Sequence, residues 1–337
     1  MSKVFAEVVG VSKRFVTKPD FAEAIAARLG AKAVDRTVHA LDGVNLTIEK
    51  GEVVGLVGES GCGKSTLGRV IAGMLDPSEG SVLIDGRDRT GLKGKDARQA
   101  RLQSQIIFQD PMSSLNPRKK VLDIVGEAPV AHGLIRRGEK EGLVVSLLKT
   151  VGLDPAMRHR YPHQFSGGQR QRIGIARALA VQPQFLVCDE SIAALDVSIQ
   201  AQVINLFMRL REELDLTYLF ISHDLSVVHH ISDRVVIMYL GRIVESAPTE
   251  TIFADPNHPY TAALLEEVPR IDRRHREFSS IRGEIPSPIN PPPGCHFHPR
   301  CPFAHERCRT ERPELKPVAQ GHLSACHLND ENGRIPA

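Results

Sequence analysis

Short apolar runs alternate with longer amphipathic segments along the chain of 337 residues. Short runs bounded by polar or turn residues are typical of buried strands, and we expect core strands at residues 53–57, 185–188 and 218–221. Helical spacing of apolar residues predicts helices at 66–73 and 199–214. Because strands and helices alternate, the pattern predicts an α/β fold with a mainly parallel sheet.

The segment before residue 50 has a different pattern. Residues 4–9 and 44–48 are strand-like, and we expect them to form N-terminal antiparallel strands. Between them, helical spacing predicts a short amphipathic helix at 20–31. A further strand is expected at 81–84, where the Asp85-Gly86 turn ends it.

Changes in composition divide the chain. Residues from about 95 to 165 are polar with mostly helical spacing, which predicts an inserted helical subdomain. Two runs at 235–240 and 242–245 predict a terminal hairpin around Gly241. Beyond Pro269 the chain becomes rich in proline, arginine and histidine. We therefore expect a main domain at 1–268 and a small irregular cysteine-rich extension at 269–337.

Residues 58–66 match the phosphate-binding pattern G-x-x-x-x-G-K-[ST]. A chance glycine-rich turn is the alternative, but the motif lies between a predicted strand and a predicted helix. Lys64 would reach the β- and γ-phosphates of a nucleotide, and the Ser65 hydroxyl would bind Mg²⁺. The residues expected around the phosphates are Gly58, Glu59, Ser60, Gly61, Cys62, Gly63, Lys64, Ser65 and Thr66.

Composition excludes several classes of protein. Lys and Arg number 43 and Asp and Glu 40, a net charge of +3 that is too balanced to predict nucleic acid as a main partner. No apolar run approaches the length of a membrane span, and the N-terminus lacks the core of a signal peptide. Six cysteines are too few for a disulfide scaffold, which favours a reducing cytoplasm. Any membrane association would therefore need a partner subunit.

Two further groups of residues indicate what reaction a bound nucleotide would undergo. The strand at 185–188 leads into Asp189, which can hold Mg²⁺ through water, and Glu190, which can polarise an attacking water. An acidic pair on any surface is the alternative. A predicted helix begins with the segment Ser166-Gly167-Gly168-Gln169, and backbone amides exposed at its N-terminus can bind an anion. A helix cap without a ligand is the alternative.

Taken together, these residues resemble the ATPase subunits of ABC transporters over residues 4–268, with Ser166–Gln169 as the family signature. The resemblance implies that Gln109 lies near Mg²⁺ and the coupling surface, and that His223 contacts the γ-phosphate. It assigns Asp196 to the D-loop, and Phe15 to stacking on adenine, although a core phenylalanine is the alternative.

The resemblance also implies ATP and Mg²⁺ as cofactors and a dimer of two ATPase subunits. Ser65, Gln109 and Asp189 would hold Mg²⁺. Lys64, Asp189, Glu190 and His223 would act on a nucleotide bound by their own subunit, whereas Ser166, Gly167, Gly168 and Gln169 would close over the partner's nucleotide. One departure is Ser191, where the family usually has proline; its loss loosens the D-loop backbone but removes no catalytic group.

The C-terminal third resembles the oligopeptide and dipeptide importer branch, and within it the second of the two ATPase subunits. The resemblance is carried by segments 258–261, 282–288 and 291–295. It implies two transmembrane permease subunits, an identical or paralogous second ATPase subunit, an indirect solute-binding partner and a place on the cytoplasmic face of the membrane. Because this branch also serves nickel, glutathione and sugar-peptide cargo, the cargo stays open.

Four cysteines cluster in the extension, at Cys295, Cys301, Cys308 and Cys326. Their spacing is wider than that of a zinc knuckle and suits a four-thiolate iron–sulfur site. Members of the importer branch carry a 4Fe–4S cluster on such a tail. Zinc stays open, because histidines that could substitute as ligands lie nearby in sequence, at His296, His298, His305, His322 and His327. Free buried thiols are a further alternative. Separately, Cys62 in the phosphate motif predicts inhibition by thiol alkylation that ATP prevents.

Two other functions share these motifs. Chromosome-maintenance and DNA-repair ATPases carry the signature, but those of the chromosome-maintenance type need a long coiled coil between Gln109 and Ser166, and no sustained heptads occur there. Ribosome-associated ATPases usually carry two such cores in one chain, whereas one is found here. Both are less favoured than an importer subunit.

Overall fold

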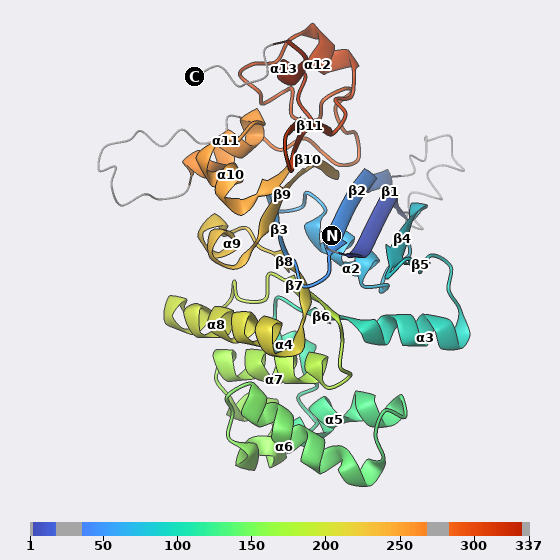
Figure 1. Cartoon of the computed structure of the whole chain (residues 1–337), viewed down its shortest axis with the longest axis vertical. Helices are drawn as coiled ribbons and strands as arrows, with labels where there is room; N and C mark the ends of the chain where they lie inside the picture. Colours follow the sequence, from blue (N-terminus) through green and yellow to red (C-terminus); the bar gives the residue numbers. More distant parts are fainter. Residues whose placement is uncertain (1–2, 18–35, 268–282, 332–337) are drawn as a thin grey trace, which may run out of the picture.

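A computed structural model describes residues 3–17, 36–267 and 283–331 of the chain. The helix predicted at 20–31 lies outside these ranges. Figure 1 shows an elongated molecule with a helical layer at one end, the C-terminal extension at the other, and the sheets between them. Among the described residues, no helix combines the length and the apolar character needed to cross a membrane.

An eight-stranded sheet forms the centre of the fold, in the order β11-β12-β10-β9-β3-β8-β7-β6. The strands from β9 to β6 are parallel to their neighbours, and the pairs between β9 and β11 are antiparallel. Their bounds are Val53–Val57 (β3), Ser104–Ile107 (β6), Phe185–Asp189 (β7), Thr217–Ile221 (β8), Arg234–Tyr239 (β9), Arg242–Pro248 (β10), Lys316–Ala319 (β11) and His322–Ser324 (β12). The predicted α/β fold with a mainly parallel sheet is confirmed.

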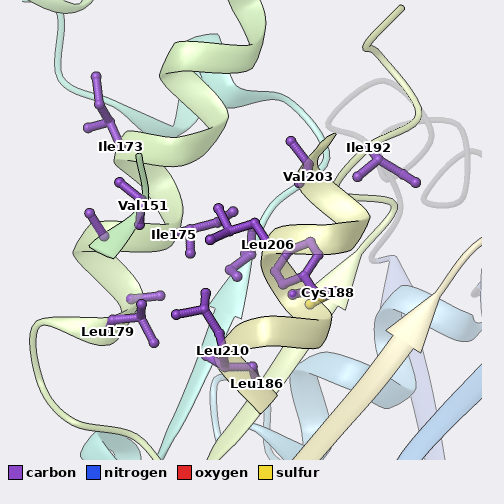
Figure 2. Close-up of a cluster of buried hydrophobic side chains, with 14 of the residues drawn as sticks. Val151, Ile173, Ile175, Leu179, Leu186, Cys188, Ile192, Val203, Leu206 and Leu210 are labelled. Carbon is purple, nitrogen blue, oxygen red and sulfur yellow. The ribbon is translucent and has the colours of Figure 1, made fainter. Parts of the chain in front are cut away.

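Strand β7 shows why the parallel strands are mostly apolar. Its side chains alternate between two cores, so that Leu186 and Cys188 belong to one cluster and Phe185 and Val187 to the other. Figure 2 shows the first cluster, where side chains of β7 pack against those of helices α7 and α8. The second cluster includes Leu67 from helix α2. Helices therefore cover both faces of the parallel region, at α2 (Lys64–Ile71), α7 (Gly167–Leu179) and α8 (Val197–Leu214).

The predicted N-terminal antiparallel strands form a second sheet, in the order β2-β1-β4-β5. Both β1 and β2 are longer than their apolar runs indicated, and several register shifts interrupt their pairing. Apart from the buried Ser12, the polar positions whose burial is described are exposed or partly buried, because one face of an antiparallel sheet can remain in water. The bounds are Val4–Thr17 (β1), Arg36–Glu49 (β2), Glu79–Ile84 (β4) and Arg87–Asp88 (β5).

Helices dominate the region between β6 and β7. Helices α5, α6 and α7 contact one another and form the layer at the lower end of Figure 1. Besides α7, this region contains α4 (Pro111–Ser114), α5 (Val121–Ala131) and α6 (Lys140–Thr150), with 3₁₀ turns at Arg137–Glu139, Pro155–His159 and Pro162–Gln164. Helix α3 (Gly94–Gln103) comes directly before β6. One difference from the expectation at 95–165 is β6, which pairs with β7 in the main sheet. Its short run of two apolar residues gave no clear strand signal.

The C-terminal extension is mostly irregular but continues the main sheet. The hairpin of β9 and β10 is confirmed, yet it is not terminal, because β12 pairs with β10 at Glu245 and Ser246. The extension contains the short helices α12 (Glu306–Thr310) and α13 (Leu328–Glu331), and three more short helices precede it, at α9 (Leu225–Ile231), α10 (Thr249–Ala254) and α11 (Pro259–Glu266). The predicted boundary between 268 and 269 lies at the edge of a range outside the description, so that division stays a prediction.

Candidate nucleotide-binding site

The phosphate loop joins the end of β3 to the first turn of α2, as predicted. Gly63 has φ +108°, and a Cβ added there would lie 2.3 Å from the carbonyl oxygen of Ala40. Only glycine fits this close approach of two backbone segments. The loop therefore presents its amides at the N-terminus of α2, which favours a bound anion.

Lys64 is buried at the centre of the loop. Its ammonium group donates hydrogen bonds to the carbonyl oxygens of Gly58, at 2.6 Å, and Glu59, at 3.0 Å. The ammonium is thus held within the loop by backbone oxygens. These carbonyls supply the partners that a buried charge requires.

Ser65 and Asp189 meet although they are far apart in sequence. The Ser65 hydroxyl donates a hydrogen bond to Asp189 Oδ1 at 2.7 Å. Burial raises the pKa of the Asp189 carboxyl above its ordinary value, and the bond from Ser65 opposes that rise. Hydroxyl and carboxylate oxygens are the ligands that Mg²⁺ prefers, so this pair fits that ion.

Glu190 adopts a left-handed backbone conformation, with φ +47°. Its Oε2 accepts a hydrogen bond from the Gln109 side-chain amide at 2.8 Å and lies 3.7 Å from His223 Nδ1. A non-glycine residue at positive φ is strained and is often found at a functional site. The carboxylate is therefore held between two side chains that the sequence analysis assigned to the same site.

One topological fact explains this convergence. The phosphate loop follows β3, Gln109 follows β6, Asp189 and Glu190 end β7, and His223 follows β8. These four strands are neighbours in the parallel part of the sheet, so their carboxyl ends lie at the same edge. In parallel α/β sheets this edge is where ligands bind.

Phe15 lies on β1, paired with Val38 of β2, in the second sheet. Its side chain is 41% exposed, which removes the alternative that it is an ordinary core residue. The ammonium of Lys13 lies 5.4 Å from the ring centroid. The ring is therefore available for a contact with a planar ligand.

The signature residues lie elsewhere. Ser166 is the N-cap of α7, and its side chain and that of Gln169 accept hydrogen bonds reciprocally from each other's backbone amides. Figure 1 shows α7 well separated from α2 and its phosphate loop. A Cβ on Gly167 would contact Leu195, and one on Gly168 would lie 2.4 Å from Ile199 Cγ2.

Asp196 is close to these residues in the fold. It is the N-cap of α8, although its side chain makes no capping hydrogen bond. The contacts of Gly167 and Gly168 with Leu195 and Ile199 place the signature beside the D-loop. The structure thus brings the predicted site residues together as two groups, one at the sheet edge and one at the start of α7 and α8.

Two further side chains contact the phosphate loop, and the sequence analysis did not single them out. Tyr260 of α11 and Arg300 of the extension both bond to Glu59. Tyr260 belongs to a segment used only to assign the branch, and no local pattern links either residue to the loop.

Cys62 differs from the expectation of a reactive thiol. It is only 3% exposed, and burial raises the pKa of the thiol, partly opposed by the neighbouring Lys64. The thiolate is the reactive form, so a buried thiol with a raised pKa reacts slowly. This geometry contradicts ready alkylation in the conformation described.

The four cysteines of the extension line one small cavity. Burial raises the pKa of Cys301 to about 11 and that of Cys326 to about 12. Within the described residues, however, no three or more His, Cys, Asp or Glu side chains are placed so that they could hold a metal ion. The iron–sulfur cluster and the zinc ion expected from the sequence are therefore not confirmed.

Comparison with known proteins gives two matching family models. The ABC transporter model matches residues 41–193, and the model described as "Oligopeptide/dipeptide transporter, C-terminal region" matches residues 244–308. The oligopeptide transport ATP-binding protein AppF of Bacillus subtilis is 52% identical over 295 residues, which cover 86% of this chain and 90% of AppF. This chain belongs to the ABC transporter family.

Other members of the ABC transporter family are similar in sequence or structure. The probable peptide ABC transporter ATP-binding protein y4tS of Sinorhizobium fredii is 50% identical, with 86% of this chain and 83% of y4tS covered. The structure of cbiO1 from Clostridium perfringens has a TM-score of 0.62 and 27% identity, over 75% of this chain and 91% of cbiO1. The dimeric cassette MJ0796 bound to ADP and phosphate has a TM-score of 0.61 and 28% identity, over 72% of this chain and 98% of MJ0796.

Proposed function

We propose that this chain is the ATP-hydrolysing subunit that energises a membrane importer for oligopeptides or dipeptides. The proposal depends mainly on one observation. Two groups of residues that a single ATP-hydrolysing site requires lie apart from each other in this chain. The phosphate loop, Gln109, Asp189, Glu190 and His223 lie at the carboxyl edge of the sheet, whereas the signature lies at the start of α7. A second subunit would complete the site.

The sheet-edge residues would act on a nucleotide bound by their own subunit. Lys64 would exchange its two carbonyl partners for the β- and γ-phosphates, since three donors on its ammonium can be redirected. Ser65, Gln109 and Asp189 would hold Mg²⁺, which neutralises charge on the phosphates when bound. Glu190 would orient and polarise the attacking water, and His223 would contact the γ-phosphate.

Three further roles concern adenine and the partner subunit. The exposed ring of Phe15 would stack on adenine. The α7 N-terminus, with Ser166, Gly167, Gly168 and Gln169, would contribute its amides to the partner's nucleotide. Asp196 would lie at the same interface. This arrangement makes hydrolysis depend on closure of two subunits, which ties it to a large motion.

Sequence similarity supports the peptide cargo. The curated relatives described above are named for oligopeptide or peptide transport, and the C-terminal region matches a family model of such transporters. We infer two permease subunits, a second ATPase subunit of the same or a paralogous type, and a solute-binding protein that acts indirectly. The subunit would bind the cytoplasmic face of the membrane through the helical layer of α5 to α7. We also propose the division into 1–268 and 269–337.

Reconstitution with cognate permease subunits tests this function. Proteoliposomes loaded with ATP should accumulate labelled peptides from a saturated solute-binding protein. Nickel, glutathione and sugar-peptide conjugates serve as competing cargo. Accumulation of one of these, without peptides, would reject the peptide assignment while retaining the ATPase.

Dependence on protein concentration tests the dimer. The ATPase rate per chain should rise as concentration increases, because the active species contains two chains. A strictly monomeric sample with full activity at every concentration would reject the composite site. Co-purification with ribosomes or DNA, instead of hydrophobic membrane subunits, would favour one of the other ATPase classes.

For the tail cysteines we propose a 4Fe–4S cluster in preference to zinc. Support comes from one cavity that all four cysteines line, Cys295, Cys301, Cys308 and Cys326, together with Phe297, Phe303, Leu328, Pro259 and the histidines His258, His298 and His327. A single zinc ion needs four thiolates within about 4 Å of one another, given Zn–S bonds of about 2.3 Å. A cluster spaces its thiolates more widely, and its role here would be structural or regulatory.

Anaerobic purification distinguishes these occupants. Iron and sulfide in stoichiometric amounts, with absorbance at about 400 nm, would support the cluster. Replacing all four cysteines by serine should remove that absorbance. A colourless protein with one zinc per chain, or with no metal, would reject the cluster.

A further inference from the structure

Glu59, the second residue of the phosphate loop, is bonded by two segments that are remote in sequence. The guanidinium of Arg300 donates to both carboxylate oxygens, at 2.7 and 2.9 Å. The backbone amide of Glu59 donates to the Tyr260 hydroxyl at 2.9 Å. A helix after the hairpin and the C-terminal extension thus converge on one residue of the nucleotide site.

The ion pair of Arg300 and Glu59 is largely removed from water. The Arg300 side chain is 4% exposed and that of Glu59 is 20% exposed. Arg300 Nη1 also lies 3.4 Å from the Tyr239 hydroxyl, and its Cζ lies 5.9 Å from the Tyr239 ring centroid. A bidentate pair fixes orientation as well as distance, and loss of one partner would leave a buried charge uncompensated.

The backbone carbonyl group of Glu59 faces Lys64. Its carbonyl oxygen accepts a hydrogen bond from Lys64 Nζ at 3.0 Å. One residue therefore connects the extension through its side chain, α11 through its amide, and Lys64 through its carbonyl. A shift of Glu59 would move the backbone that positions Lys64.

The surroundings make this connection rigid. The rings of Tyr239, Tyr260 and Phe297 contact one another, with centroids 4.7 to 5.3 Å apart. Phe297 lies on the same irregular turn as Arg300, whose backbone amide donates to the Phe297 carbonyl at 2.9 Å. The guanidinium is thus held by packed aromatic side chains and is not a mobile surface charge.

We propose that Arg300 and Tyr260 are positioning residues for the phosphate loop, and that the C-terminal extension sets the affinity for ATP through Arg300. This inference rests on the proposed function, since it concerns the same nucleotide site. Neither residue needs to touch ATP. The extension is then a working part of the ATPase site in addition to a continuation of the sheet.

Two substitutions distinguish a positioning role of Arg300 from a purely electrostatic effect of its charge on ATP binding. If Arg300 acted only through its charge, Arg300→Gln would weaken ATP binding and Glu59→Gln would strengthen it, because a negative charge near the phosphates is removed. If the pair positions the loop, both substitutions weaken binding. Arg307→Gln is the matched control, since Arg307 lies in the same extension and pairs with Glu311 and Asp330 at the surface.

Isothermal titration of the full chain with MgATP measures the effect. We expect each of R300Q and E59Q to raise the Kd roughly 10-fold, which corresponds to about 1.4 kcal/mol. The double variant should be no weaker than the worse single variant, because both break one pair. R300K should restore part of the affinity, and R307Q should match the wild type.

Kinetics of the assembled transporter supply a second readout. The KM for ATP should rise in R300Q while kcat stays within about 2-fold of the wild type. If R300Q fails to fold, Y260F decides, since it retains the ion pair and the ring; it should raise the Kd about 2- to 5-fold, as expected for one neutral hydrogen bond.

Three outcomes overturn the inference: R300Q binds ATP as R307Q does, E59Q binds ATP more tightly than the wild type, or Y260F leaves the Kd unchanged where R300Q does not fold. A wild-type chain that does not bind ATP would instead reject the proposed function. The two failures are therefore distinguishable.

Discussion

The side-chain amide of Gln109 donates a hydrogen bond to the Glu190 carboxylate at 2.8 Å, across the carboxyl edge of the sheet. His223 Nδ1 lies 3.7 Å from the same oxygen. Glu190 is therefore oriented before a nucleotide enters, and its strained backbone at φ +47° is held by partners from two other strands.

Glu190→Gln should abolish steady-state hydrolysis and leave ATP binding intact. A glutamine retains the oxygen that accepts from Gln109 but cannot polarise water as a base. We expect kcat to fall at least about 100-fold, which phosphate release from the assembled transporter measures. The control is Glu212→Gln, which changes an exposed carboxylate on α8. Near-normal turnover in E190Q would show that another group activates the water.

Gly168→Ala should impair hydrolysis much more than it impairs ATP binding. Its Cβ would lie 2.4 Å from Ile199, so either the signature or the start of α8 must shift. A displacement of this kind should lower kcat roughly 10- to 100-fold.

Gly174→Ala is the matched control on the same helix, because a Cβ there meets nothing within 4 Å. It should stabilise the chain by about 0.5–1 kcal/mol through helix propensity, measured as a higher melting temperature. Equal kcat values for G168A and G174A would contradict the packing argument.

Phe15→Ala should weaken ATP binding with little effect on stability. The ring is 41% exposed, so its removal leaves no large cavity. Loss of an aromatic contact of about 0.5–1.5 kcal/mol predicts a Kd raised roughly 2- to 10-fold. Phe15→Trp should retain the affinity. Val16→Ala, at an exposed neighbouring position, should have no effect. An unchanged Kd in F15A would assign adenine binding to another residue.

Cys62 should react slowly with iodoacetamide in the folded chain, and faster as the pH rises. Burial raises the pKa of the thiol, so the thiolate fraction at neutral pH is below that of a free cysteine and increases only at more alkaline pH. Timed labelling followed by mass spectrometry of the peptide measures the rate. The same peptide from denatured protein is the reference, and equal rates in both states would contradict the burial described here.

The sequence alone predicted the parts of this fold that depend on local patterns. The phosphate motif could be placed because a buried strand precedes it and a helix follows it, and Asp189 because an apolar run ends there. Strand β6 gave a weaker signal, since Ser104 and Gln105 precede its two apolar residues. It lies in the sheet because β7 pairs with it, which is a non-local cause.

Contacts between residues that are far apart in the sequence could not be predicted in this way. Arg300 and Glu59 are 241 positions apart, and neither periodicity nor spacing connects them. The 41% exposure of Phe15 likewise could not be predicted from a local pattern. Its expected role in adenine binding followed from family resemblance, whereas the structure shows that the ring is accessible.

The pairing of β12 with β10 has a consequence for the order of events during translation. The outer edge of β10 has unpaired backbone groups until residues 322–324 have been synthesised, and such an edge invites pairing with other chains. The fully buried Glu245 also lacks its His322 partner, which lies 77 positions later and bonds to it at 2.7 Å. The amides of Asn257 and His258 already donate to the Glu245 carboxylate, so this third partner is added last. A nascent chain that stalls before residue 322 therefore exposes an unpaired strand edge, and native assembly of this half of the sheet is a late event.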